Sequence, residues 1–281
     1  MQRQGFLTQE TSNQFKKALG LLVNSNVWIA MNASALVLMS GKVLHIAPKI
    51  NVLLLVFFST LADYNLQAIA DAKTSFQDKG FRIIGRKHIL FLVGVLAILW
   101  LCRGFDRYQL LYLAHLAFIS VLYAIPTKIL DLPPLREIPF LKIFLITYVW
   151  VGATAIFPFW SYIDDPKLWA LVAERALFIF AITLPFDIRD EKRDLEKMLY
   201  TIANQLGATQ TRWIAIGCLV ASFLVVGVYL KELLLPFTLT YLIAGWLIFK
   251  SDRKLDNLYF TGLLDGTMLL QTLLVYCFLV M

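Results

Sequence analysis

The sequence is short of charged residues. Only 16% of its 281 residues are Asp, Glu, Lys or Arg, whereas 59% are hydrophobic, and the mean hydropathy is +0.69. Soluble domains average roughly a quarter charged residues and about half apolar ones. A soluble core of this size could not bury so much apolar surface. The composition therefore excludes an ordinary soluble domain and favours a protein that presents apolar surface to lipid.

Cysteine is equally scarce, and Cys102, Cys218 and Cys277 stand at unrelated spacings inside apolar stretches. They predict neither a disulfide framework nor a metal site. The long apolar runs lack the period-two alternation that marks strands, so helices are favoured. The basic residues do not alternate with aromatic residues in a patch, and we expect no nucleic-acid partner.

Nine apolar segments are present, most of them long enough to cross a bilayer, which takes about 20 helical residues. They are residues 18–40, 50–71, 88–102, 107–125, 138–160, 166–187, 212–230, 232–250 and 257–280. We expect an all-α polytopic membrane protein with about nine transmembrane helices in a bundle around a central cavity. Residues 18–281 are interpreted as one transmembrane domain, preceded by a polar cytoplasmic segment, residues 1–17.

The distribution of basic residues predicts the orientation. If the N-terminus is cytoplasmic, eighteen of the 26 Lys and Arg residues fall on the cytoplasmic side and six on the outer side, with a bias that alternates from loop to loop. Basic loops are retained in the cytoplasm. We expect an integral protein of a bacterial inner membrane, with its N-terminus in the cytoplasm and its C-terminus outside. The two most charged loops, after the second and sixth spans, then share the cytoplasmic face.

Two of the spans end in stripes of polar residues. The second span ends with Asp63, Gln67 and Asp71, which stand at i, i+4 and i+8 and so share one helical face. The sixth span ends with a stripe at i, i+3 and i+7, formed by Asp187, Asp190 and Asp194. Acidic residues at a membrane are costly and indicate function. Two stripes at the same depth predict one shared site, although solvated helix ends that set topology are the alternative interpretation.

Clustered carboxylates need a cation, and hard oxygen ligands with room for water and phosphate favour Mg²⁺. We expect its ligands among the acidic residues Asp63, Asp71, Asp187, Asp190 and Asp194. Nearby basic residues are candidates for contacts to a diphosphate, namely Lys73, Lys79, Arg82, Arg189, Lys192 and Arg193. Lys142, at the start of the fifth span, has two interpretations, a diphosphate contact or snorkelling to the interface.

The stretch from Asp187 to Gly207 resembles the second aspartate-rich motif of the UbiA superfamily of intramembrane prenyltransferases. That motif runs Asp-x-x-Asp-x-x-x-Asp, followed by a Gly, a Thr and a terminal Leu-Gly. The matching residues are Asp187, Asp190, Asp194, Thr201, Leu206 and Gly207. Met198 stands where the family has its Gly. The nine-span layout extends the resemblance over nearly the whole chain.

The first family motif, Asn-Asp-x-x-Asp-x-x-x-Asp, would close the second span. Alignment on the polar stripe places Asp63 at the Asn, Tyr64 at the first Asp, Gln67 at the second and Asp71 at the last. Two of the three acidic positions are therefore replaced, while Asp63 supplies one carboxylate at the Asn position. This departure bears directly on whether the site holds metal as the family does.

The resemblance implies an enzyme that binds a polyprenyl diphosphate through Mg²⁺, ionises it at C1 and transfers the prenyl group to an aromatic or related hydrophobic acceptor. The prenyl tail would lie among the spans, open to the lipid bilayer. The aromatic residues that could face the carbocation are Tyr64, Tyr123, Tyr148, Trp150 and Phe186, although packing is the simpler role for each.

Two other classes of function remain open. The altered first motif is also compatible with a catalytically degenerate UbiA-like protein that binds isoprenoids or organises other membrane enzymes. A transporter is less favoured, because the sequence shows no internal repeat and no matching pair of broken spans. Among other polar residues within spans, Asp265 could face the cavity, and Arg175 needs a partner. Asn26 and Asn32 could bind the acceptor or bridge helices.

Overall fold

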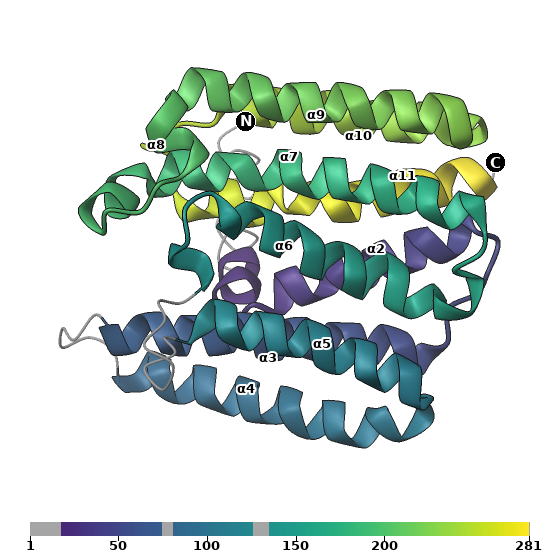
Figure 1. Cartoon of the computed structure of the whole chain (residues 1–281), viewed down its shortest axis with the longest axis horizontal. Coiled ribbons are helices and arrows are strands. Elements are labelled where there is room, and N and C mark those ends of the chain that lie inside the picture. Colours follow the sequence, from purple (N-terminus) through teal and green to yellow (C-terminus); the bar gives the residue numbers. More distant parts are fainter. Residues whose placement is uncertain (1–17, 75–80, 126–134, 281) are drawn as a thin grey trace, which may run out of the picture.

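The chain forms an elongated bundle whose helices run side by side along the longest axis of the molecule (Figure 1). The computed structural model describes residues 18–74, 81–125 and 135–280. Its helices are Ala18–Asn24, α2 (Val27–Val43), α3 (Ile50–Thr74), α4 (Phe81–Leu101), α5 (Arg107–Ala124), α6 (Leu141–Val151), α7 (Pro166–Glu196), α8 (Ile202–Leu206), α9 (Ala208–Tyr229), α10 (Leu234–Lys250) and α11 (Gly266–Val280). No described residue lies in a strand, which confirms the predicted helical class.

Seven of the described helical segments are long and apolar enough to cross a membrane. The number becomes eight if Ala18–Asn24 and α2, which meet at a bend of 82°, are taken as one span. The predicted count of nine is not confirmed. The remaining long helix, α5, has only 18 residues, and these include Arg107, Gln109 and His115, which lower its hydropathy.

Helix α7 is the most buried of the candidate spans. It begins at Pro166, behind the N-cap Asp165, whose carboxylate accepts the Lys167 N–H at 2.8 Å. Its 31 residues are about 46 Å long, well beyond the roughly 30 Å of bilayer hydrocarbon. The expected sixth span, residues 166–187, and the acidic stripe therefore belong to one helix. The carboxylates lie on the last turns of this helix.

Two charged residues in the first third of α7 are fully buried and hydrogen-bonded. The Arg175 guanidinium donates to Thr154 Oγ1 at 2.8 Å and to Ser40 Oγ at 3.0 Å. Its neighbour Glu174 accepts from the Tyr241 hydroxyl at 2.7 Å and from the amide of Gln271 on α11 at 2.9 Å. These bonds tie α7 to four other parts of the bundle, so Arg175 has the structural partners that its position requires.

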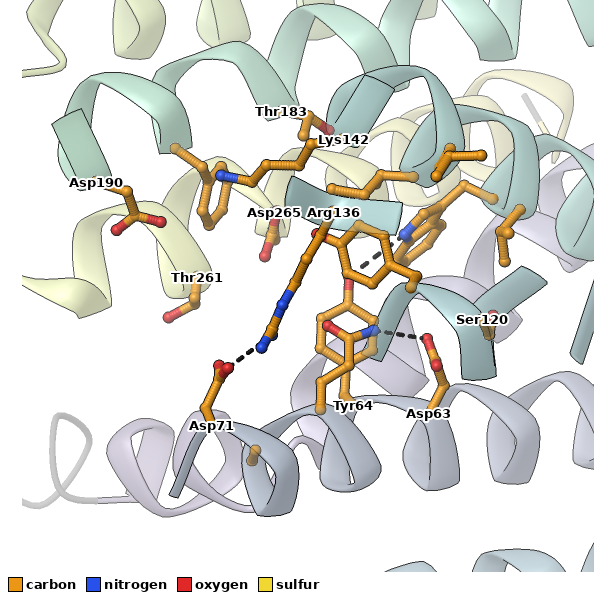
Figure 2. A pocket seen from close by; sticks show the side chains of 18 of the residues that line it. Asp63, Tyr64, Asp71, Ser120, Arg136, Lys142, Thr183, Asp190, Thr261 and Asp265 are labelled. Carbon is orange, nitrogen blue, oxygen red and sulfur yellow. Dashed lines mark hydrogen bonds and ion pairs between the residues drawn. The ribbon is translucent and has the colours of Figure 1, made fainter. Parts of the chain in front are cut away.

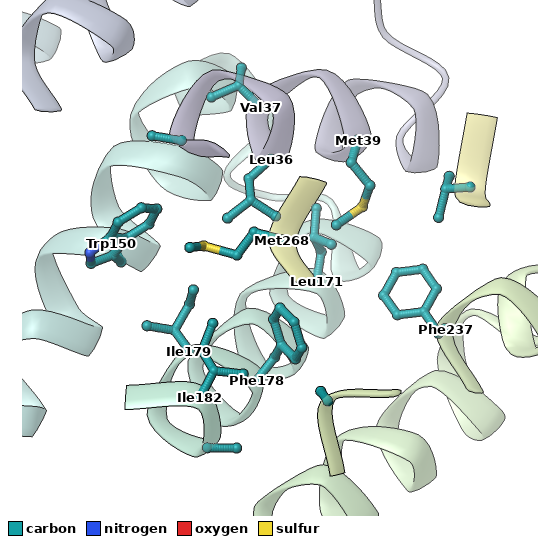
Figure 3. Close-up of a cluster of buried hydrophobic side chains, with 14 of the residues drawn as sticks. Leu36, Val37, Met39, Trp150, Leu171, Phe178, Ile179, Ile182, Phe237 and Met268 are labelled. Carbon is teal, nitrogen blue, oxygen red and sulfur yellow. The ribbon is translucent and has the colours of Figure 1, made fainter. Parts of the chain in front are cut away.

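Around these polar contacts, an apolar core fills the space where α2, α7, α10 and α11 meet. Leu36, Phe178, Ile182, Phe237 and Met268 are among its buried side chains (Figure 3). Asn32 bridges two of the same helices, because its side-chain oxygen accepts the Leu269 N–H at 3.1 Å. The core fixes α7 against α11, and the ends of these helices form two walls of the cavity described below.

The chain after α7 turns back sharply to α9. Thr201 caps α8, accepting the Asn204 N–H at 3.3 Å while Asn204 accepts the Thr201 N–H at 2.9 Å. Gly207 follows α8 with φ +82°, a conformation that favours glycine. The Phe140 N–H donates to the Tyr200 carbonyl at 3.0 Å and ties this turn to the start of α6. The Thr and Leu-Gly positions of the motif are thus structural.

Met198 adopts the left-handed conformation, with φ +55°, and its side chain is 86% exposed. A residue with a Cβ is strained in this conformation by about 1–2 kcal/mol. Replacement by glycine removes the strain, but the larger conformational entropy of glycine in the unfolded chain offsets part of the gain. We expect Met198→Gly to raise the free energy of unfolding by about 0.5–1 kcal/mol, measured by SDS titration in detergent micelles.

The matched control is Met31→Gly, at an exposed position in the interior of α2. Here glycine should lower stability by about 1 kcal/mol, because it weakens a helix. A destabilising effect of glycine at both positions would contradict the strained conformation of Met198.

Candidate functional site

A cavity of about 430 Å³ lies between α3, α5, α6, α7 and the segment that leads into α11. This size is within the usual range of small-molecule sites. Figure 2 shows its polar lining, with Asp71 and Asp190 toward one end and Asp63 toward the other. We call the end at Asp71 and Asp190 the mouth, because the Asp71 side chain is 51% exposed there.

The α3 stripe lines the cavity from one end to the other. Asp63, Gln67 and Asp71 all contribute to its wall. Gln67 donates to Asp63 Oδ2 at 3.0 Å. Asp71 Oδ1 accepts from Arg136 at 2.6 Å. Because eight residues of helix rise about 12 Å, the Asp63 carboxylate lies deep in the bundle while Asp71 stays at the mouth.

Across the mouth, Asp190 is held by two arginines of its own helix. Arg189 donates to both carboxylate oxygens, at 2.9 and 3.0 Å, and Arg193 donates to Oδ2 at 2.9 Å. Arg189 also donates to the side chain of Asn257 at 2.7 Å. Asp190 of the α7 stripe therefore lines the cavity with its carboxylate already paired to two arginines.

Lys142 lies between the other two carboxylates of this stripe. Its Nζ donates to Asp187 Oδ1 at 2.9 Å and lies 3.6 Å from Asp194 Oδ2. The two carboxylate side chains are only 3% and 4% exposed. The sequence left two interpretations of Lys142, a diphosphate contact or snorkelling to the interface. Snorkelling does not describe the observed position, because the ammonium lies between two carboxylates. Asp187 lines a smaller pocket beside Tyr200, whereas Asp194 lines the main cavity.

A third polar stripe, which the sequence analysis missed apart from Asp265, comes from the last span. Asn257, Thr261 and Asp265 line the cavity at i, i+4 and i+8. They flank or belong to the π-helical segment η6 (Leu258–Leu264). Their spacing matches that of the α3 stripe and was available in the sequence. Only one of the three is acidic, so the stripe did not stand out among other polar residues near span ends.

The wall away from the mouth combines aromatic and uncharged polar groups. The Trp150 indole N–H donates to the Tyr64 hydroxyl at 3.3 Å. Tyr123 and Ser120 of α5 and Asn26, at the bend before α2, also line this part. Tyr64 therefore contributes an aromatic ring to this wall.

The structure does not bring every predicted residue to the cavity. Tyr148 is exposed, and its hydroxyl lies 3.0 Å from a ring nitrogen of His115 on an outer face of the bundle. Lys192 is exposed and does not line the cavity. Lys73 and Arg82 lie in helices, but their side chains are outside the described part of the chain, as is the whole of Lys79.

Two basic residues at the mouth were missed. Arg136 comes from a short 3-10 segment, η2 (Leu135–Glu137), and Lys197 follows α7 directly. Neither lies on a stripe of a span. Only the folding of the two connections over the mouth gives these residues a site.

Among the residues that the structure describes, no three His, Cys, Asp or Glu side chains converge to hold a metal ion by themselves. Mg²⁺, however, is usually held by one or two carboxylates together with waters and substrate phosphates. Asp190 and Asp194 line the mouth, and the buried Asp194 Oδ2 accepts no hydrogen bond. The carboxylate oxygens of Asp190 and Asp194 are suited to a Mg²⁺ ion that a phosphate group also coordinates. They do not form a closed cage of protein ligands around a metal.

The bundle and its cavity define a polytopic helical membrane protein in which carboxylates from separate helices face one another at one end. Two solved structures share this fold. A UbiA homologue from Archaeoglobus fulgidus bound to GPP and Mg²⁺ superposes with a TM-score of 0.65 at 11% identity, over 93% of this chain and 99% of that one. Digeranylgeranylglyceryl phosphate synthase superposes with a TM-score of 0.58 at 16% identity, over 92% and 96% of the two chains.

No protein-family model and no curated protein matches the sequence. The chain nevertheless has the UbiA fold, and the resemblance seen in the second motif is confirmed at the level of fold.

Removing the Lys142 ammonium would leave Asp187 and Asp194 buried without their cation. We expect Lys142→Met to lower the free energy of unfolding by about 3 kcal/mol, the usual cost of an uncompensated buried charge. Adding Asp187→Asn should recover at least about 1 kcal/mol of that loss, because one of the orphaned charges is then gone.

The control is Lys167→Met, because Lys167 pairs with Glu232 at 3.6 Å on an exposed surface. That change should cost less than about 1 kcal/mol. Equal losses from both lysine substitutions in SDS titrations would show that Lys142 is not the central cation of this cluster.

Proposed function

We propose that this protein transfers a polyprenyl group from an allylic diphosphate to a hydrophobic acceptor inside the membrane, with Mg²⁺ as its cofactor. The observation that carries the proposal is the mouth of the cavity. There, residues of both motif positions and a set of arginine and lysine side chains meet, while an aromatic wall lies deeper in the bundle. Such a site matches a molecule with a charged head and an apolar chain.

The charge of the lining explains how a diphosphate would be held. Six carboxylates and five cations line the cavity, a formal balance of one negative charge. The cations are Arg136, Lys142, Arg189, Arg193 and Lys197. Arginine forks suit phosphate oxygens. We infer that the diphosphate takes Arg189 and Arg193 as donors in exchange for part of their contact with Asp190.

The same balance favours a divalent cation. A diphosphate adds about three negative charges to a lining that already carries a small excess of negative charge. The arginines alone do not offset the sum of these charges. Asp190 and Asp194 are the residues that would hold Mg²⁺ together with the phosphates. When bound, Mg²⁺ would neutralise charge on the leaving diphosphate. The archaeal homologue with GPP and Mg²⁺ supports this assignment by analogy of fold.

The deeper part of the cavity provides what the reacting carbon needs. Departure of the diphosphate breaks the C1–oxygen bond and leaves positive charge on the allylic carbon. The rings of Tyr64, Tyr123 and Trp150 line this part and present faces that attract a cation. They also exclude water that would otherwise capture the carbocation. Ile119, Leu145 and Val149 form an apolar side wall suited to the prenyl chain.

We propose that the mouth faces the cytoplasm of a bacterial cell, as the basic residues indicate. Met198 lies exposed in the turn after α7, beside the mouth. A Met198→Cys variant in a background without Cys102, Cys218 and Cys277 should react with a membrane-impermeant maleimide in inside-out vesicles. It should remain unlabelled in intact spheroplasts. The reverse pattern would place the mouth outside.

The central experiment replaces the two cavity-facing carboxylates of α7. Asp190→Asn combined with Asp194→Asn should reduce diphosphate release from geranylgeranyl diphosphate by at least about a hundredfold, because the leaving group loses its metal-assisted stabilisation. Release by the unaltered protein should also stop when EDTA removes Mg²⁺ and return when Mg²⁺ is restored.

Glu196→Gln is the matched control, since Glu196 is an exposed carboxylate at the end of the same helix. It should leave release unchanged. The SDS unfolding midpoint of each variant separates loss of function from loss of fold. Undiminished release by the folded double variant would contradict the assignment.

The alternative is a non-catalytic protein that binds isoprenoid diphosphates. One observation favours it, namely that Asp71, Asp187 and Asp190 are each paired with Lys or Arg of the chain itself. Such pairing lowers the need for a metal. The same assay decides between the two functions, because a binding protein would retain geranylgeranyl diphosphate without releasing diphosphate, with or without Mg²⁺.

A further inference from the structure

Helix α5 has an exposed side that differs in character from that of the preceding helix, α4. Both helices lie on the side of the bundle opposite α9 and α10 (Figure 1). From Ile89 to Trp100, every exposed side chain of α4 is apolar, as contact with lipid requires. Only Leu116 and Ala124 of α5 are buried, although α5 is not among the helices apolar enough to cross a membrane. Helix α5 is therefore exposed more widely than its composition favours.

A polar pair lies on the exposed side of α5 at the middle of the helix. His115 is exposed, and its Nε2 lies 3.0 Å from the hydroxyl of Tyr148 on α6, which is also exposed. His115 follows Arg107 by eight residues and precedes Ala124 by nine, so it lies roughly 12–14 Å from either end of α5. An ionisable side chain at this depth is costly in hydrocarbon and indicates a function. The proposed function gives this pair no role.

The pair retains hydrogen-bonding capacity in both directions. A neutral imidazole has one donor and one acceptor nitrogen, and a tyrosine hydroxyl can donate and accept. Whichever tautomer His115 adopts, its bond to Tyr148 uses one donor and one acceptor and leaves one of each. The Nδ1 atom of His115 forms no hydrogen bond with any residue in the described part of the chain. The remaining donor and acceptor face lipid, whose hydrocarbon can satisfy neither.

Other residues on the same side of α5 are spaced as at a contact between two helices. Leu111, Ala114, Phe118 and Val121 are all exposed and follow one another at intervals of three, four and three residues. This is the spacing of a left-handed helix pair. Ala114, next to His115, is small enough to let a second helix approach closely. We call these four residues the seam, and the polar pair lies beside its centre.

We propose that the seam is the interface of a two-fold symmetric dimer, in which the second copy of this chain satisfies the pair of His115 and Tyr148. In such a dimer the same surface meets itself. The free donor of each pair then bonds the free acceptor of the pair on the partner subunit. The dimer gains two hydrogen bonds, and both pairs leave lipid. A second copy fits because the surface offers equal numbers of donors and acceptors at one depth.

The dimer would also support one wall of the cavity. Ser120 and Tyr123 line the cavity from α5, whereas His115 and Tyr148 do not. Ser120 is turned by about 140° from His115 around the helix axis, so the cavity side and the seam side of α5 are distinct. Because α5 buries few of its own side chains, a second copy packed behind it restrains this wall. The inference does not depend on the proposed function, since the seam lies outside the cavity.

Cross-linking tests the geometry of the dimer. In a background without Cys102, Cys218 and Cys277, Ala114→Cys should form a disulfide across the seam on mild oxidation in membranes. The product should have twice the 32.1 kDa mass of the chain. Leu96→Cys, at an exposed position of α4, is the matched control and should remain monomeric. Equal cross-linking at the two positions, or cross-linking of Ala114→Cys only to a different protein, would overturn the dimer.

Energy transfer tests the polar pair. Met198→Cys, labelled in the same cysteine-free background, reports association of the full chain in phosphatidylcholine vesicles, because Met198 is exposed. His115→Leu should raise the dissociation constant of the dimer at least about tenfold, since two hydrogen bonds within the membrane are lost per dimer. Tyr148→Phe should act in the same direction. His115→Asn keeps a donor and an acceptor and should preserve the dimer.

Trp246→Leu is the control for this measurement. Trp246 is exposed on α10, a helix on the opposite side of the bundle (Figure 1), and its replacement should leave the dissociation constant unchanged. The SDS unfolding midpoint identifies any variant that has lost its fold. Absence of energy transfer at every protein-to-lipid ratio would overturn the proposal. A dimer that folded His115→Leu and Tyr148→Phe variants form as tightly as the unaltered protein would also overturn it.

Discussion

A charge that leaves water for the interior of a bilayer must find an opposite charge or hydrogen-bond partners, and this constraint organises the molecule. Lys142 lies between Asp187 and Asp194, and Arg189 and Arg193 hold Asp190. Further from the edge, Arg175 uses the hydroxyls of Ser40 and Thr154. Each contact joins helices that are distant in sequence or fixes a side chain at the cavity. The ion pairs therefore determine both how α7 packs and what the mouth presents.

A site built from pairs binds an anion by exchange. If a diphosphate binds at the mouth as proposed, it takes over donors that Asp190 and Asp71 already engage, and its binding energy is the difference between two charge-assisted networks. Such a site favours a ligand that also brings its own counter-ion, because the displaced carboxylates then regain a partner. The deeper part of the cavity has no comparable group of lysine and arginine side chains.

The helical class, most of the spans and the two acidic stripes could be predicted, because hydropathy and the 3.6-residue period act within a single segment. Asp71 and Asp190 meet at the mouth, as their shared depth predicted, whereas Asp63 lies at the opposite end of the same cavity. What could not be predicted depends on contacts between segments. The Lys142 ion pairs depend on the packing of α6 beside α7, and Arg136 reaches Asp71 from the short segment before α6. The Tyr148 hydroxyl lies beside His115 of α5 and not in the cavity. The count of nine spans is not confirmed, because the polar residues of α5 make it a marginal span.

The length of α7 has a consequence for the lipid in which the protein works. One helix of 31 residues carries the buried Arg175 network in its first third and the acidic stripe at its end, so the helix sets the separation of the two. A bilayer that thickens or thins cannot move one without the other. Hydrophobic mismatch is instead taken up by tilting of the helix or by deformation of the surrounding lipid. Membrane thickness therefore sets the height of the mouth relative to the phospholipid headgroups, and lipid composition becomes a physical determinant of how easily a membrane-dissolved molecule places its polar end in the site.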